Sequence, residues 1–349
     1  MNKSIYLVST LITVASFLGC TKTETVVEAS PIGEEFELSF DQYVLNHYFV
    51  DTSYIAQYEP YYQNSIPIVN PASQIIEAEV WGQRQGSAID PDDRFGVAWI
   101  SLPSRPSEGY DSSYRTSPEI VGSVEFGRFY RLDPLSYHLE GDGLLGVLSI
   151  NLFPLPDIKF AIAYRRADGS QYGDFLRNGF IDSTTTPMVL KMIKPTNLFS
   201  NGPRYPTAWR MLLKNIYYLH LGPAHVSRYA FELGIFRAAE AGDDESAIQG
   251  QPLLRVVGLD RFDADGVPTV DGDGLFDFRL GLTIDQDAGE IIFPSLRPLD
   301  NGIREYFMLR GLPPPDSLYI FSDLYDTTWT VAQQSPRNRY FIRGRAIFD

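Results

Sequence analysis

The sequence predicts an all-β protein, either a jelly-roll-like β-sandwich or two such sandwiches packed together. The chain has 349 residues, among them 28 glycines and 24 prolines, and aromatic residues make up 13%. Many turn residues combined with many aromatic residues favour short strands separated by tight turns. Several segments alternate apolar and polar residues at the two-residue period of a strand. Long helical runs of alanine and leucine are absent.

Composition also narrows the class of partner. Hydrophobic residues make up 44% of the chain, which is enough for a sizeable core. The formal net charge is −15. Nucleic acids are bound through clustered lysine and arginine, so this charge argues against them as partners. Anionic membrane surfaces are disfavoured for the same reason.

The N-terminus predicts a lipid anchor. Lys3 precedes an apolar segment, residues 5–18, that is too short to span a bilayer and ends in Phe-Leu-Gly-Cys. This ending resembles a bacterial lipobox, and Cys20 is the single cysteine of the chain. We therefore expect a signal peptide over residues 1–19, lipidation at Cys20 and a flexible tether over residues 20–33. The alternative is an ordinary signal peptide that is cut nearby.

A single β module is expected over residues 34–349. In its first half, apolar patterns predict strands over Ile75–Trp81, Phe95–Leu102, Leu144–Leu152 and Ile158–Tyr164. Trp81, Trp99 and Trp209 fall within or beside such patterns and are expected in the core, whereas Trp329 is expected to be exposed.

The second half predicts further strands. Tyr229–Phe236 alternates as a strand does, and Leu253–Val257 is an apolar run. Leu282–Ile284 and Glu290–Phe293 flank a short turn that contains glycine, which predicts a hairpin. The last apolar run, Tyr340–Phe348, could form an unpaired edge strand that invites association.

A loop rich in aspartate and glycine follows Leu259 and is the main candidate for a metal site. Ca²⁺ prefers several oxygen ligands on a loop that can curl around it. The candidate ligands are Asp263, Asp265, Asp271, Asp273 and Asp277. The EF-hand pattern is not met, because its distal glutamate is missing. The alternative is a structural turn whose carboxylates accept hydrogen bonds from nearby backbone amides. No other cofactor is expected.

Other chemical motifs are weak. Gly141–Gly146 reads G-x-G-x-x-G, but a strand rather than a helix is expected after it, so a dinucleotide site is not indicated. His220 and His225 do not form a zinc motif. Neither a nucleophile elbow nor a phosphate-binding loop is present. The sequence therefore predicts a protein that is not an enzyme.

The spacing of several segments resembles the SprA (Sov) family, the outer-membrane translocon of gliding motility and type IX secretion. The stretch from Leu253 to Pro298 is similar to the family pattern "LL…LD…DG-x-FDF…G-x-TI…G-x-I-x-FP-x-x-x-P". The matching residues there are Leu253, Leu254, Leu259, Asp260, Asp273, Gly274, Phe276, Asp277, Phe278, Gly281, Thr283, Ile284, Gly289, Ile291, Phe293, Pro294 and Pro298. Weaker matches, including Trp209 to Leu219, extend the resemblance over about residues 75–345.

The resemblance implies an accessory module rather than a pore, because the family's long transmembrane barrel has no counterpart here. It implies a non-catalytic lipoprotein of the outer membrane, on its periplasmic or cell-surface face, that contacts envelope or secretion-system proteins. Three alternatives remain open: a surface lipoprotein that binds glycans, an envelope hydrolase, or a fragment of a split translocon. A row of exposed aromatic side chains would favour glycan binding, and paired carboxylates in a cleft would favour a hydrolase.

Overall fold

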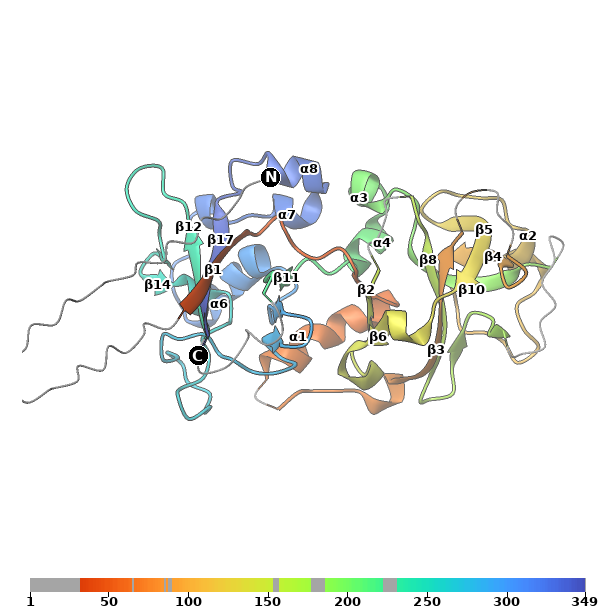
Figure 1. The fold of residues 1–349 in the computed structure, drawn as a ribbon, viewed down its shortest axis with the longest axis horizontal. Coiled ribbons are helices and arrows are strands. Elements are labelled where there is room, and N and C mark those ends of the chain that lie inside the picture. Colours follow the sequence, from red (N-terminus) through yellow and green to blue (C-terminus); the bar gives the residue numbers. More distant parts are fainter. Residues whose placement is uncertain are drawn as a thin grey trace, which may run out of the picture.

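The computed structural model describes residues 32–64, 66–84, 86, 90–152, 157–176, 186–221 and 231–348. Strands account for 31% of the residues and helices for 24%, so the expected predominance of strands is confirmed. The strands form several small sheets and one five-stranded barrel, and a jelly-roll sandwich is not confirmed. Figure 1 shows an elongated molecule with a three-stranded sheet at one end and the barrel at the other.

The barrel contains three of the four strands expected from the first half of the sequence, or parts of them. The fourth, Leu144–Leu152, contains β7 (Val147–Ile150), which belongs to a smaller sheet. The members of the barrel are β3 (Ile75–Gln83), β4 (Arg94–Trp99), β5 (Val124–Arg131), β8 (Phe160–Arg166) and β10 (Met188–Lys194). They pair in the order β10-β4-β5-β3-β8, and β8 pairs again with β10. Only β10 and β4 run parallel. This second pairing of β10 closes the sheet and removes its free edges. The two-residue strand β9 (Gln171–Tyr172) extends from β8.

Strand β10 is buried along its whole length. Its sequence, Met-Val-Leu-Lys-Met-Ile-Lys, places lysines among apolar residues, so the charged groups need partners inside the fold. Lys191 Nζ lies 2.8 Å from Asp51 Oδ2. Lys194 Nζ donates to the carbonyl oxygen of Ile158 at 2.5 Å.

The last strand of the chain is central in its sheet. Strand β17 (Tyr340–Phe348) pairs antiparallel with β1 (Ile32–Ser39) on one side and with β12 (Phe231–Arg237) on the other. The expectation of an unpaired edge strand is therefore wrong. Tyr340 and Ile342 are buried, whereas Arg343 is exposed and reaches Glu37 across β1 at 2.7 Å.

Smaller sheets connect the two ends. One contains β2 (His47–Phe49), β7 (Val147–Ile150) and β6 (Tyr137–Leu139). Another contains β11 (Ile216–Tyr218), β16 (Glu290–Ile292) and β15 (Ile284–Asp285). The strands β13 (Ala247–Ile248) and β14 (Gln251–Pro252) form a two-stranded ribbon. Strands β15 and β16 pair antiparallel, so the predicted hairpin is confirmed.

The helices are short. They are α1 (Ile55–Gln63), α2 (Ser112–Thr116), α3 (Leu198–Asn201), α4 (Pro206–Met211), α5 (Leu253–Val256), α6 (Ile303–Leu309), α7 (Asp323–Asp326) and α8 (Trp329–Gln333). The apolar run that begins at Leu253 forms α5, not a strand. Leu253, Leu254 and Val256 are all buried, and a fully buried short run does not distinguish helix from strand by its period.

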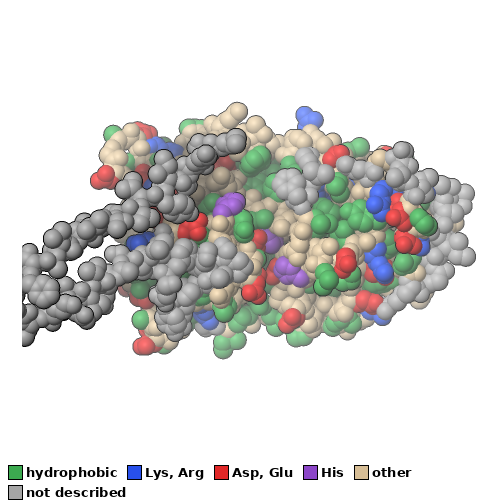
Figure 2. Space-filling view, in the orientation of Figure 1, with side chains coloured by type: hydrophobic (Ala, Val, Ile, Leu, Met, Phe, Trp, Pro, Cys, Tyr) green, Lys and Arg blue, Asp and Glu red, His purple; other side chains and the backbone are tan. Residues whose placement is uncertain are grey.

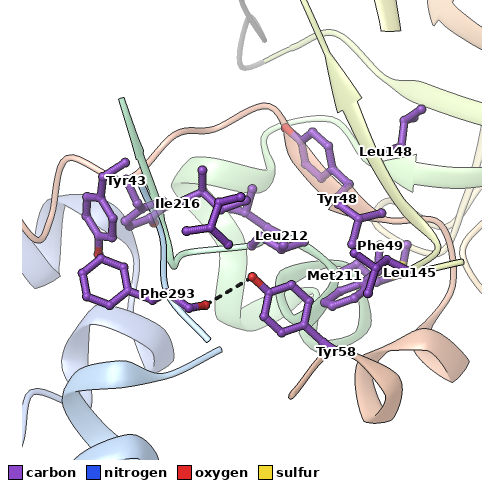
Figure 3. Packing of buried hydrophobic residues seen from close by; sticks show 14 of the residues in the cluster. Tyr43, Tyr48, Phe49, Tyr58, Leu145, Leu148, Met211, Leu212, Ile216 and Phe293 are labelled. Atoms are coloured by element: carbon purple, nitrogen blue, oxygen red, sulfur yellow. Dashed lines mark hydrogen bonds between the residues drawn. The ribbon is translucent and has the colours of Figure 1, made fainter. Parts of the chain in front are cut away.

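One hydrophobic cluster runs through the sheets and helices. Figure 3 shows part of it, where Tyr58 of α1 points toward Phe293 beyond β16. Trp81 and Trp209 are buried, and Trp329 is 37% exposed, so these three predictions are confirmed. Trp99 is partly buried and packs against Tyr114.

Candidate functional site

A cavity of about 400 Å³ opens where α4, α7 and the loop after β16 meet. Its volume lies in the range that small-molecule sites occupy. The walls are mainly apolar and are formed by Ile55, Pro203, Pro206, Leu212, Leu213 and Leu296. Six polar or aromatic residues complete the lining: Trp209, Arg210, Lys214, Arg297, Tyr325 and Asp326.

Lys214 is the buried cation of this cavity. Its side chain is 5% exposed, and Nζ lies 4.1 Å from the centre of the Trp209 ring. Nζ donates to the carbonyl oxygens of Trp209 at 2.7 Å and of Leu212 at 3.3 Å. These carbonyls lie at the C-terminal end of α4, where a lysine is favourable. Burial, together with the charge of Arg297, lowers the pKa of Lys214 to about 7, and the charge of Asp326 opposes this fall.

Arg297 is the second cation and is already paired. It contacts Asp300 at 2.5 Å and Asp326 at 2.7 Å, and it lies 4.9 Å from the centre of the Tyr325 ring. Tyr325 in turn accepts a hydrogen bond from Trp209 Nε1 at its carbonyl oxygen, 2.7 Å away. The Trp209 ring is therefore bonded to the backbone of Tyr325, and a cation lies over each of the two aromatic rings.

A second cavity of about 450 Å³ lies beside the aspartate-rich loop. Three arginines line it: Arg255, Arg261 and Arg310. Arg255 contacts Asp260 at 3.2 Å, and Arg310 contacts Asp271 at 3.4 Å. Glu305 also lines this cavity. Burial raises the pKa of its carboxyl, and the charge of Glu59 adds to this rise.

Asp260 organises the aspartate-rich loop. Its carboxylate is 1% exposed, and Oδ1 accepts hydrogen bonds from the backbone of Asp273 at 2.9 Å and of Gly274 at 3.2 Å. Gly272 passes so close that a Cβ atom there would lie 1.8 Å from Asp260 Oδ1. The loop thus folds around a carboxylate that Arg255 neutralises. The SprA-like "LD" pattern contains this residue, although its role could not be read from sequence.

The carboxylates of four of the five candidate calcium ligands contact backbone amides or an arginine. Asp263 accepts from the amides of residues 265 and 267, and Asp273 from that of residue 275. Asp277 accepts from the amides of Arg261 and Phe262 at 2.6 and 3.3 Å. Asp271 contacts Arg310, and the backbone of Asp265 serves as a donor. Among the described residues, no three or more acidic, histidine or cysteine side chains form a group that could hold a metal ion.

Asp277 is the aspartate of this set whose carboxyl has a raised pKa. Burial raises the pKa of its carboxyl to about 6, and the charges of Asp260 and Asp273 act in the same direction. The two backbone hydrogen bonds oppose that rise but do not cancel it. Asp277 is not among the residues that line either cavity.

A series of polar side chains, buried at His47 and Ser149 and exposed at His138, joins the small sheets at the middle of the molecule. His47 Nδ1 lies 2.6 Å from Ser149 Oγ, and His47 Nε2 lies 3.2 Å from Glu290. Ser149 donates to Glu140 at 2.5 Å, and Glu140 lies 2.7 Å from His138. The hydrogen bond to Glu140 raises the pKa of His138. Figure 2 shows histidine side chains near the middle of this face, close to acidic ones.

This group of polar side chains contains the residue types of a serine hydrolase, but its serine is not exposed to a substrate. Ser149 is 1% exposed, and its hydroxyl is bonded to Glu140 as well as to His47. A nucleophile must face the substrate that it attacks. The geometry therefore fits a structural link between the sheets of β7 and β16.

The remaining sequence candidates are placed as follows. Gly141–Gly146 forms a turn that leads into β7, so a strand follows it as expected. His220 packs against Tyr218 at 4.7 Å, and His225 lies outside the described residues. Cys20 and residues 1–31 also lie outside them. In the described part of the chain, no helix is long and apolar enough to cross a membrane.

The sequence was also compared with known proteins. No protein-family model matches it, and no curated protein matches it.

Proposed function

We propose that this chain is a non-catalytic lipoprotein module of the cell envelope, associated with type IX secretion or gliding-motility machinery and acting through protein–protein contacts. The observation that carries the proposal is the SprA-like spacing over about residues 75–345, preceded by a lipobox-like ending at Cys20. The module would be held at the outer membrane by lipid alone. Its partners would be other proteins of the envelope.

The structure supports this proposal through the places of the residues that carry the resemblance. Leu253, Leu259, Asp260, Ile291 and Phe293 are each at most 1% exposed. Part of the resembling pattern therefore falls on buried framework positions, whereas Asp273, Gly274 and Gly281 are exposed. The pattern does not mark a set of side chains gathered around a reaction centre.

The tether sets the reach of the module. The first described strand, β1, begins at Ile32, so 11 residues, 21–31, separate it from the proposed lipid at Cys20. A fully extended chain spans at most about 3.5 Å per residue, which limits the distance to roughly 40 Å. Partners would thus lie close to the same membrane surface.

The three-stranded sheet offers surfaces for such partners. Strands β1 and β12 each pair with β17 on one side only within the described structure. An exposed strand edge can accept a strand from a partner. Charged side chains also cover the outer face, where Arg343 lies between Glu37 and Asp244 at 2.7 and 3.2 Å.

The two alternative functions, glycan binding and hydrolysis, have less support. Among the described residues, Tyr218 and Trp329 are the only aromatic side chains with large exposure, and they belong to separate elements, β11 and α8. This arrangement is not the row of rings that glycan binding would favour. Glu59 lies near Glu305, but its carboxylate already holds Ser295 and the amide of Leu296.

Gene deletion in the source bacterium tests the proposal. We expect loss of type IX cargo secretion or of gliding, restored by the wild-type gene and not by the Cys20→Ala gene. Normal secretion and gliding in the deletion strain would overturn the association. An equal rescue by Cys20→Ala would overturn the requirement for the anchor while leaving the association intact.

A further inference from the structure

We propose that the cavity between α4 and α7 binds an amphipathic carboxylate, with its apolar chain against the proline and leucine walls and its carboxylate at Lys214 Nζ. This inference concerns a ligand site and does not depend on the partners proposed above. Three observations carry it: the shape and lining of the cavity, the incomplete pairing of Lys214, and the contrast with the second cavity.

The lining suits an apolar chain. Two prolines of the α4 region and three leucines, Leu212, Leu213 and Leu296, form most of the wall, and Trp209 contributes an aromatic surface. The volume of about 400 Å³ accommodates a chain of roughly ten carbon atoms, given that sites for small ligands start near 300 Å³. Burying such a chain is favourable by about 0.8 kcal/mol per methylene group.

The polar anchor follows from the contacts of Lys214. An ammonium group has three donors, and two of them reach the carbonyl oxygens of Trp209 and Leu212. Among the described residues, no carboxylate oxygen lies within 4.0 Å of Nζ. A buried cation without a counter-ion is costly, so an anionic ligand would relieve it. A carboxylate at Nζ would take the third donor.

The charged side chains near Lys214 do not supply its counter-ion. Asp326 is the nearest acidic residue in the lining, and it is engaged with Arg297, which Asp300 also neutralises. Arg210 lines the cavity as well and adds positive charge. The net field at Lys214 therefore favours an anion.

In the second cavity, acidic side chains offset the charges of two of its arginines. Its Arg255 and Arg310 are paired with Asp260 and Asp271, and Glu305 adds a negative charge. Arg261 donates to the carbonyl oxygen of Tyr62 at 3.3 Å. The charges of Arg255 and Arg310 are thus compensated by carboxylates. Among the described residues that line the two cavities, Lys214 is the buried cation without a carboxylate partner.

Because Lys214 titrates near neutral pH, the affinity of the site for a carboxylate should depend on pH. Burial, together with Arg297, lowers its pKa to about 7 in the empty cavity, and Asp326 opposes that fall. A bound carboxylate favours the charged amine, so binding takes up protons near neutral pH. A fatty carboxylate stays ionised above pH 6, because carboxyl groups titrate near 4 to 5. Affinity should therefore fall as pH rises from 6 to 8.5.

Calorimetric titration of the full chain carrying Cys20→Ala, with decanoate as the probe and 1-decanol as the uncharged control, tests the proposal. We expect decanoate to bind at least tenfold more tightly than 1-decanol at pH 6. We also expect decanoate affinity to fall by at least tenfold between pH 6 and pH 8.5 while 1-decanol affinity stays constant. Equal affinities for the two probes, or a flat pH profile, would overturn the proposal.

Two variants locate the site. Lys214→Met removes the charge at nearly constant volume and should lower decanoate affinity at pH 6 by at least tenfold. Lys194→Met is the matched control, because Lys194 is also a buried lysine whose pKa burial lowers to about 7, but it does not line the cavity. The Lys194→Met variant should bind decanoate as tightly as the protein without this substitution. Equal losses in both variants would overturn the assignment. If Lys214→Met fails to fold, the pH profile with the two probes decides.

Discussion

The side-chain amide of Asn215 donates to the hydroxyl of Tyr58 at 2.7 Å, and the two groups share one acceptor. Asn215 Nδ2 and the Tyr58 hydroxyl both lie within hydrogen-bonding distance of the Phe293 carbonyl, at 2.8 and 3.3 Å. Figure 3 shows Tyr58 and Phe293 in this arrangement. The contact ties α1, the segment before β11 and the end of β16 together in the middle of the core. Asn215 is completely buried.

Replacing Asn215 should therefore be costly. Asn215→Ala leaves a buried hydroxyl and a buried carbonyl with one partner fewer and opens a small void, so we expect a loss of about 2–4 kcal/mol in the free energy of unfolding. Urea denaturation measures it. Asn64→Ala is the control, because Asn64 makes a similar bond to Pro60 but is exposed. It should cost less than about 1 kcal/mol. Similar losses in the two variants would contradict the role of the buried contact.

The aspartate-rich loop should be sensitive to bulk at one glycine and not at another. Gly272 and Gly266 both have positive φ angles, 57° and 78°. A Cβ atom at Gly272 would collide with Asp260, whereas at Gly266 it meets nothing within 4 Å. Both alanine variants carry the strain of about 1–2 kcal/mol for a left-handed residue. Gly272→Ala should lose at least about 2 kcal/mol more, as thermal or urea unfolding would show. Equal losses would mean that the Asp260 contact is not formed in solution.

Removing divalent cations should leave the loop intact. The carboxylates of Asp260, Asp263, Asp273 and Asp277 accept hydrogen bonds from backbone amides, and such bonds need no metal ion. We expect the melting temperature to change by less than about 1 °C when a chelator is added, which corresponds to a few tenths of a kcal/mol. A fall of several degrees that Ca²⁺ reverses, and that Asp273→Ala abolishes, would establish a calcium site instead.

Asp277 should make stability depend on pH between about 4 and 6. Its folded-state pKa, about 6, is above the ordinary value of 3.8, so the folded protein binds a proton more tightly than the unfolded chain. The associated stabilisation is present below pH 4 and is lost as pH rises through 6. Asp277→Asn removes this contribution. From pH 4.5 to pH 7.5 the variant should therefore lose less stability than the wild type, by on the order of 1 kcal/mol after solvent screening.

Chemical denaturation at the two pH values checks this expectation. Other titrating groups contribute equally to both proteins, so the difference between the two slopes isolates Asp277. Identical slopes would show that the carboxyl titrates normally.

The local patterns of the sequence predicted strands better than they predicted architecture. The two-residue period at Ile75–Trp81 and the Gly-containing turn before Glu290 gave β3 and the β15–β16 hairpin correctly. Closure of the barrel depends on the pairing of β10 with both β4 and β8, which are far apart in sequence. No local period encodes such pairings. The same holds for the position of β17 between β1 and β12.

The candidate cavity was not predicted, because its polar anchor is hidden in an apolar segment. Lys214 follows Met211-Leu212-Leu213, and a lysine in such a context is the signal that could have indicated a buried charge. The aspartates of the loop were candidate ligands only because the loop is rich in aspartate and glycine. Which carboxylate is buried depends on tertiary packing, and Asp260 rather than Asp271 is the one that the loop encloses.

The most direct test of the central claim is quantitative affinity purification of the tagged protein from crosslinked envelopes of the source bacterium. The wild-type protein is compared with Cys20→Ala at equal expression. We expect the lipid-anchored protein to enrich type IX secretion or gliding components of the outer membrane at least tenfold over the unanchored variant. If no such component is enriched with the wild-type protein, the proposed association is contradicted.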